Sequence, residues 1–411
     1  MSRPEIVDGR FAYNSGSDPT FDHEMSMNRC IPLFVYCLWM AISSLAIRSY
    51  AQDSLRPMFN GKDLSGWVLT NTPPETWRVE DGLLICSGKP IGEIRTDKMY
   101  QNFIMELEWR HMVPRGNAGV FVWADDITAR GVPFHRGIEV QILEDAYGNS
   151  TSHTTHGDIF PIHGATMTPI NGRKGSRAFP SENRALPSPQ WNHYRIECRD
   201  GEIALAVNGK VVTRGNDAVP RKGYICLESE GGVVHYRNVK IQALPGGELP
   251  PNQVAIADRG YRSLYSGLDL EGWKLGDGDR RWEANDWVLA FKGDKDEQGQ
   301  LRSTQSFERL GFIVDVRLKS DASSAVIQTT SMTDIDLSRP EIAEHLEPAG
   351  RWNRIEGTLI NEKYTILVNG QPASGTARTT PSGNSSISLV ASGPVEFCNL
   401  YARSLTANGS N

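Results

Sequence analysis

Short runs of alternating apolar and polar residues dominate the chain from Pro57 onward, and turns built from Gly, Asn-Gly and Asp-Gly separate them. Sustained helical periodicity is nearly absent. Alternation with a period of two is typical of half-buried β-strands, so the pattern predicts an all-β protein. The clearest predicted strands cover residues 103–111, 118–123, 138–143, 194–198, 203–207, 223–227 and 233–241.

One of these predicted strands carries polar side chains in an unusual place. Its residues Ile138, Val140 and Ile142 share one face. Glu139 and Gln141 share the other face, so a carboxylate and an amide are presented side by side. Two interpretations are open: an antiparallel strand with one solvated face, or the floor of a polar binding site.

The same order of motifs occurs twice in the chain. Segment 59–67 is matched by 265–273, and the pair Trp191-Asn192 is matched by Trp352-Asn353. Between these landmarks the second copy is shorter by about 45 residues. The missing residues should include the counterpart of 137–145 and the loop that follows it.

These landmarks predict two β domains in tandem, and the motifs of the first domain make each of them a concanavalin A-like jelly roll only through the resemblance that those motifs carry. The first covers 52–245, a Pro- and Gly-rich linker covers 246–259, and the second covers 260–405. The second domain is expected to be a degenerate copy that serves in binding or packing.

Residues 1–51 are predicted to form an N-terminal extension and a secretory signal peptide. Arg29 precedes an apolar run at 30–47, and Ser49 and Ala51 suit the positions before a cleavage site. An uncleaved membrane anchor is the alternative. The expected location is therefore periplasmic or extracellular, after cleavage near Ala51.

Composition narrows the possible partners. A net charge of -6 without a basic face argues against nucleic acid. Since no glycine-rich phosphate loop lies between a strand and a helix, no nucleotide cofactor is expected. The 10 Trp residues fit buried sandwich cores and sugar-stacking surfaces equally well. The four Cys residues beyond the signal peptide lack zinc-site spacing and suit either disulfides or buried free thiols.

A set of motifs runs through the first predicted domain: FNGKDLSGW, WRVEDGLL, NFIMELEWR, GNAGVFV, GIEVQIL, WN and YRNVKI. Together they resemble the 3-keto-disaccharide hydrolase domain family, and PAGRWN, VNG and GPVEFCNL make the second domain similar to it in part. The resemblance implies a jelly roll of two curved antiparallel sheets whose concave face binds sugar. It also implies cleavage of sugars already oxidised at C3, so a separate oxidoreductase must supply the substrate. The chain departs from the family pattern at Phe160, Glu228 and Glu230.

The implied chemistry indicates candidate catalytic residues. A ketone at C3 acidifies the C2 hydrogen, so cleavage can proceed by elimination of the C1 substituent followed by hydration. Glu139 is the expected base, because partial desolvation raises the pKa of a carboxyl group. His156 is the candidate general acid or base. Arg110 would stabilise the enolate oxygen, or else pair with Glu108 on a solvated sheet face.

Further polar side chains are candidates for sugar contacts. The loop at 145–186 is expected to form a lid or a binding rim. Glu139, together with His156 and Asp158, is a weak candidate for a divalent-metal site; His and Asp clusters in loops are also common as solvated groups. No other cofactor is expected. The candidate substrate-binding residues are Gln141, Glu108, Asn117, Asp158 and Glu228.

The sequence therefore predicts an exported carbohydrate-active protein that hydrolyses 3-keto-glycosides or 3-keto-disaccharides by elimination and hydration. Its expected partner is an oligosaccharide or glycoside substrate. The alternative is a non-catalytic, lectin-like carbohydrate-binding protein. A third interpretation is an adhesive or scaffold module without a sugar ligand.

Overall fold

The described part of the chain folds mostly into β-strands, which confirms the all-β prediction. The computed structural model describes residues 54–276, 280–294, 296–329, 334–360, 363–373 and 383–405. The helical elements in these ranges are short: η1 (Pro74–Thr76), η2 (Asp145–Tyr147), η3 (Pro251–Gln253) and α2 (Pro340–Ala343).

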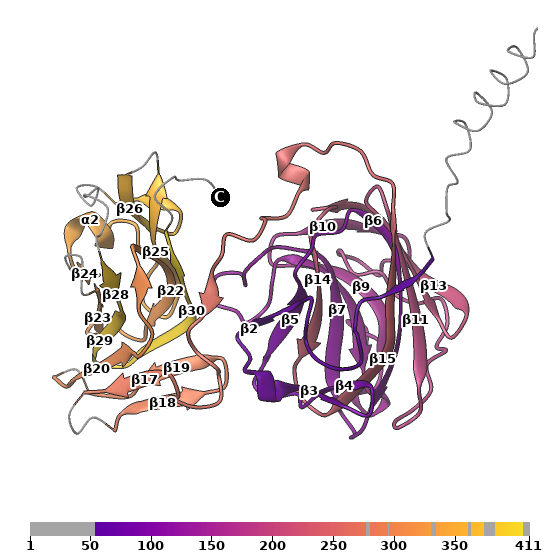
Figure 1. The fold of residues 1–411 in the computed structure, drawn as a ribbon, viewed down its shortest axis with the longest axis horizontal. Helices are drawn as coiled ribbons and strands as arrows, with labels where there is room; N and C mark the ends of the chain where they lie inside the picture. The colour runs from indigo at the N-terminus through magenta and orange to yellow at the C-terminus, as the bar shows by residue number, and fades with distance from the viewer. Residues whose placement is uncertain are drawn as a thin grey trace, which may run out of the picture. The chain divides into compact units, whose positions relative to one another are not determined.

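Two antiparallel sheets make up residues 54–244, which we call the first module (Figure 1). The nine-stranded sheet comprises β10 (Thr166–Pro169), β13 (Lys210–Val219), β12 (Glu202–Val207), β11 (Asn192–Arg199), β6 (Asn102–His111), β15 (Val234–Leu244), β4 (Leu83–Cys86) and β3 (Trp77–Glu80), with β1 (Arg56–Pro57) paired to β15. The six-stranded sheet has the order β2 (Trp67–Thr70), β5 (Gly92–Thr96), β14 (Tyr224–Ser229), β7 (Asn117–Ala124), β8 (Gly137–Leu143) and β9 (His156–Ile162).

The hydrophobic core of the first module lies between these two sheets. On β8, Ile138, Val140 and Ile142 are completely buried in this core. Burying one such side chain stabilises the fold by about 1.5–3 kcal/mol, and a slip of one residue would exchange the two faces of the strand. The three apolar residues therefore fix the register that turns Glu139 and Gln141 away from the core.

The prediction of an irregular loop at 145–186 is wrong in part, because this segment contains β9 and β10. Strand β9 pairs with β8 and forms the edge of the six-stranded sheet. Its sequence includes Gly157 and Pro161, which are both unfavourable in a strand. An edge position tolerates a proline, so pairing with β8 outweighs the weak local preference.

Two further sheets make up residues 262–404, which we call the second module. The eight-stranded sheet comprises β18 (Trp282–Asn285), β19 (Val288–Phe291), β30 (Val395–Ser404), β22 (Leu310–Leu318), β25 (Asn353–Ile360), β26 (Lys363–Val368) and β27 (Gln371–Pro372), with β16 (Arg262–Ser263) paired to β30. The five-stranded sheet comprises β17 (Trp273–Leu275), β20 (Gln298–Ser303), β29 (Ile387–Ser392), β23 (Ser324–Thr329) and β24 (Ile335–Asp336). A small separate pair joins β21 (Phe307–Glu308) to β28 (Asn384–Ser385).

The two modules differ at one end of the smaller sheet. Strand β23 pairs with β29 in the way that β7 pairs with β14. Beyond β7 the first module has β8 and β9, whereas beyond β23 the described residues contain only the two-residue strand β24. In the part of the second module that the structure describes, no long strand therefore occupies the place of the polar floor. An internal duplication stays a prediction.

Buried polar contacts join the two modules. Asn399 donates a hydrogen bond of 2.9 Å from Nδ2 to the carbonyl oxygen of Ala129, and its Oδ1 accepts one of 2.9 Å from Asn71. Arg259, in the predicted linker, pairs with the buried carboxylate of Asp126 at 3.0 Å. These contacts all lie inside the compact unit that contains residues 53–411.

The predicted signal peptide lies outside the described residues. Among the described residues, no helix has the length and apolar character needed to cross a membrane. The cysteines of this part of the chain are all buried free thiols, at Cys86, Cys198, Cys226 and Cys398.

Candidate active site on the six-stranded sheet

The face of the six-stranded sheet that points away from the core carries a cluster of carboxyl groups. Glu139 on β8, Glu228 on β14 and Glu93 on β5 are all buried there. In the strand pairing, Glu228 lies directly opposite Glu93. Two charged carboxylates at directly opposed positions destabilise a sheet, so this face favours protonated carboxyl groups or a bound cation.

Gly119 on β7 leaves space for two of these side chains. A β carbon at this position would lie 3.0 Å from Oε2 of Glu228 and 3.1 Å from Oε1 of Glu139. Both carboxyl groups therefore extend over the one position between them that has no side chain. Glu228 Oε2 is buried and has no hydrogen-bond partner among the described residues, so it is available to a ligand.

The environment raises the pKa of three carboxyl groups. Burial raises the pKa of Glu139 well above its ordinary value, and the nearby Glu230 raises it further, whereas Arg177 acts in the opposite direction. Burial also raises the pKa of Glu228, with the negative charge of Glu139 as the next cause. For Glu230 burial raises the pKa to about 7, even though a hydrogen bond with Glu228 lowers it. Raised carboxyl pKa values are typical of proton-transfer sites.

Arg177 brings a positive charge to the cluster. Its Nη1 donates a hydrogen bond of 2.9 Å to Oδ2 of Asp158, whose carboxylate is completely buried on β9. The guanidinium group lies 3.4 Å from the ring centroid of Phe160 on the same strand. Because the cation is held from two sides, it occupies a fixed position at the rim of the carboxyl cluster.

A chain of amide contacts connects the arginine to the carboxyl groups. Arg177 donates a long hydrogen bond of 3.5 Å to Oε1 of Gln141. The amide nitrogen of Gln141 donates to Oδ1 of Asn117 at 3.2 Å, and Asn117 in turn donates to Glu230. Glu139, Gln141, Asn117, Asp158 and Glu228 are thus five predicted site residues that the structure brings together on one face.

The structure does not place Arg110 and Glu108 in this site, which corrects both predictions. Strand β6 directs Met105, Leu107 and Trp109 into the core. Arg110 and Glu108 therefore project from the outer face of the other sheet. There Arg110 lies 4.4 Å from the ring centroid of Trp191, and Glu108 accepts hydrogen bonds from Arg237 at 2.8 Å and Asn238 at 2.6 Å.

His156 is also absent from the carboxyl cluster, so its predicted role as general acid or base is not supported. Its Nε2 lies 2.7 Å from Oδ1 of Asn183, and its Nδ1 lies 3.3 Å from the carbonyl oxygen of Leu143. Its ring centroid is 6.2 Å from that of the core residue Trp109. A histidine with both ring nitrogens engaged and its ring against the core has a structural role.

The predicted metal ligands Glu139, His156 and Asp158 do not converge on one point. Glu139 faces the carboxyl cluster, His156 packs beside Trp109, and Asp158 pairs with Arg177. Among the described residues, the group with the composition and spacing of a metal site is a different one, namely Glu93, His135 and Cys226.

Sequence reasoning missed Glu93 and Arg177 as site residues. Glu93 alternates with the buried Ile94 in a short strand, and this alternation is the signal that could have placed it on a polar face. Arg177 comes from an irregular segment with no such signal. Glu230 was visible only as a departure from the family pattern.

Residues 54–242 match the model of the 3-keto-alpha-glucoside-1,2-lyase-like domain family. This match identifies the first module as a glycosyl hydrolase-like, carbohydrate-active β-sandwich. This match confirms the family resemblance predicted for the first domain. None of the curated proteins matches the chain.

Solved structures with similarity to the chain include a candidate glycosyl hydrolase from Parabacteroides distasonis, at 22% identity and a TM-score of 0.38 over 47% of this chain and 95% of that one. The carbohydrate binding module CBM66 from Bacillus subtilis has 13% identity and a TM-score of 0.33, over 44% of this chain and 97% of that one. A laminarinase from Flavobacterium sp. UMI-01 has 13% identity and a TM-score of 0.30, over 46% of this chain and 98% of that one.

Proposed function

We propose that the first module cleaves 3-keto-glycosides, such as 3-keto-disaccharides, by elimination followed by hydration. The observation that carries this proposal is the pair of carboxyl groups of Glu139 and Glu228 above Gly119, beside a fixed arginine. The match of residues 54–242 to the 3-keto-alpha-glucoside-1,2-lyase-like domain family supports the same reaction. The substrate must be oxidised at C3 before it arrives, so a separate oxidoreductase acts upstream.

In the proposed elimination, Glu139 removes the proton from C2. The electron pair delocalises toward the C3 ketone as an enolate, and the C1–O bond then breaks. A carboxylate with a raised pKa is a stronger base than an exposed one, and its burial keeps competing water away. Burial and Glu230 raise the pKa of Glu139, and Arg177 acts against both and so favours the basic form.

The proton for the leaving oxygen comes from Glu230 in this mechanism. Burial raises the pKa of Glu230 to about 7, so the group holds its proton in part of the molecules near neutral pH. Arg177 and the amide of Asn117 are suited to donate hydrogen bonds to the enolate oxygen or to sugar hydroxyls. Hydration completes the reaction: water adds at C1 and gives a proton to the Glu230 carboxylate, and protonated Glu139 returns a proton to C2.

The test compares Glu139→Gln with Glu108→Gln in the purified chain. Both variants replace a carboxylate by an amide, but Glu108 lies on the other sheet and pairs with Arg237 there. With a 3-keto-disaccharide as substrate, Glu139→Gln should lose at least about a hundredfold in kcat, since a positioned base contributes typically 10²–10⁴-fold. Glu108→Gln should retain wild-type kcat. Equal rates in the two variants would contradict the assignment of Glu139.

The non-catalytic alternative is separated from this proposal by a binding measurement. If the wild-type chain binds the 3-keto-disaccharide in calorimetry but never releases a 3-keto monosaccharide, the lectin-like function holds and the hydrolase function is wrong. If neither binding nor turnover is found with oxidised and unoxidised glycosides, a scaffold role gains support.

We also propose that the protein is exported. The support is the basic residue Arg29, the apolar run after it and the small residues Ser49 and Ala51. N-terminal sequencing of the chain from a secreting host should find a mature protein that starts near Gln52. A chain that keeps residues 30–47 in the cell membrane would instead support the uncleaved anchor.

A further inference from the structure

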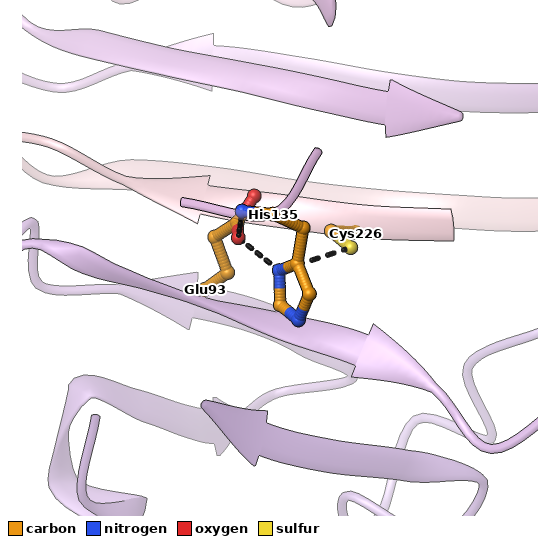
Figure 2. Close-up of side chains that lie close together, drawn as sticks. All are labelled: Glu93, His135 and Cys226. Carbon is orange, nitrogen blue, oxygen red and sulfur yellow. Dashed lines mark hydrogen bonds and ion pairs between the residues drawn. The ribbon is translucent and has the colours of Figure 1, made fainter. Parts of the chain in front are cut away.

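Three metal-binding residue types meet at Glu93, one of the residues of the carboxyl cluster. Glu93 on β5, Cys226 on β14 and His135, which precedes β8, point toward one another (Figure 2). One ligand atom of each residue lies within 4.8 Å of the other two. Strands β5 and β14 are neighbours in the sheet, so the arrangement of Glu93 and Cys226 is fixed by backbone pairing.

The distance between His135 and Cys226 suits tetrahedral coordination. His135 Nδ1 lies 3.7 Å from the sulfur of Cys226. For metal–nitrogen bonds of about 2.0–2.1 Å and metal–sulfur bonds of about 2.3 Å, two ligands of a tetrahedral ion lie about 3.5 Å apart. The Glu93 carboxylate is hydrogen-bonded directly to His135 Nδ1. A metal ion would replace this hydrogen bond, and the two groups would move apart to the separation of two ligands.

Complete burial of these three polar side chains lowers the stability of the fold unless a further partner binds them. The side chains of Glu93 and His135 are both fully shielded from solvent, and so is Cys226. Glu93 Oε1 and His135 Nε2 have no hydrogen-bond partner in the described part of the chain. An unsatisfied buried polar group costs about 1–3 kcal/mol, and a charged one more. The other carboxyl groups on this face add to the negative potential around Glu93.

We propose that Glu93, His135 and Cys226 bind one divalent transition-metal ion, with Zn²⁺ as the best fit. The mixed oxygen, nitrogen and sulfur ligand set favours Zn²⁺ over Ca²⁺ or Mg²⁺, which prefer oxygen ligands alone. A carboxylate and a thiolate supply two negative charges, which balance the charge of the ion. Binding releases the thiol proton of Cys226.

Burial and the neighbouring Glu93 raise the pKa of the Cys226 thiol, so the free thiolate is rare without metal. The site is therefore expected to fill while the chain folds or during slow local opening, not by rapid exchange with a folded protein. This assignment stands apart from the proposed hydrolysis, because it concerns metal binding and not turnover.

The experiment measures metal content in the full chain. Protein produced in minimal medium with added Zn²⁺ should contain close to one equivalent after removal of loosely bound metal. Cys226→Ser and His135→Gln should each lower the content at least about tenfold, since each removes one of three ligands. The matched control is Cys198→Ser, which alters another buried free thiol, within the core of the sandwich, and should keep the metal.

A second measurement uses the wild-type chain, so its result does not depend on whether the variants fold. Protein produced with Co²⁺ should show a thiolate-to-cobalt charge-transfer band and the intense visible bands of a tetrahedral ion. Folded wild-type protein with less than about a tenth of an equivalent of metal would overturn the proposal. Retention of full metal by folded Cys226→Ser, or a cobalt spectrum without the thiolate band, would also overturn it.

Discussion

Replacing Gly119 by Ala tests whether the space between the two carboxyl groups is the reaction site. The added methyl group would lie 3.0 Å from Glu228 Oε2, 3.1 Å from Glu139 Oε1 and 3.2 Å from Glu139 Cγ. These contacts are tighter than ordinary van der Waals distances, so both side chains must move by a few tenths of an ångström. Gly119 does not have a positive φ, so alanine causes no backbone strain at this position.

The expected effect is on rate more than on stability. Crowding in a packed region costs about 1–3 kcal/mol, and replacing a strand glycine by alanine returns about 0.5–1 kcal/mol. Displaced catalytic groups can lower a rate by about 100-fold per ångström. A shift of these two side chains by a few tenths of an ångström therefore predicts a decrease of about 3–10-fold in kcat/KM. A smaller additional loss is expected where the methyl group occupies space that the substrate needs.

The assay measures kcat/KM on a 3-keto-disaccharide together with the thermal midpoint Tm. Gly276→Ala is the control, because its new β carbon would have no neighbour closer than 3.5 Å and the glycine has no positive φ. The reasoning is refuted if Gly119→Ala folds with an unchanged Tm and turns over substrate at the wild-type kcat/KM. A large loss of Tm with normal kcat/KM in the folded fraction would refute it as well.

Two further predictions concern charge and module contacts. Because burial raises the pKa of Glu230 from 4.5 to about 7, its folded form binds the proton more tightly than the unfolded chain does. Its contribution to stability is therefore complete below about pH 4.5 and is lost as the pH rises through about 7. Between these pH values the Tm of Glu230→Gln should therefore fall less than the Tm of the wild-type chain. An identical pH profile of Tm in both proteins would contradict this. Asn399→Ala should lower stability by about 2–3 kcal/mol, because it removes buried hydrogen bonds with Asn71 and Ala129, whereas Asn238→Ala, which removes an exposed hydrogen bond to Glu108, should change it by less than about 1 kcal/mol. Equal losses in denaturant unfolding of the two alanine variants would show that the module contact is not stabilising.

The strands and the polar floor could be predicted because their signal is local. In β8 the alternation of Ile138, Val140 and Ile142 with Glu139 and Gln141 determines which side chains share a face, whatever the rest of the chain does. The same local rule grouped Glu108 with Arg110 on β6. It could not show that this second face belongs to the other sheet, because the period of a strand does not specify which sheet it joins.

The remaining site residues depend on pairing between distant segments. Glu93 and Glu228 meet only because β5 and β14 are neighbours in the sheet. His135 joins Cys226 across a separation of 91 positions. Strand β9 was not predicted for a related reason. Gly157 and Pro161 disfavour a strand locally, and β9 forms because it pairs with β8. Such contacts are set by topology, for which a single sequence carries no direct signal.

The two-residue strand β24 has a consequence for self-association. A sheet edge exposes unpaired backbone donors and acceptors, and a long flat edge can recruit another chain. Among the described residues of the second module, one edge of the five-stranded sheet is Ile335–Asp336, which offers very few such groups and carries an acidic side chain. A short acidic edge of this kind limits the pairing of one chain with another and therefore aggregation.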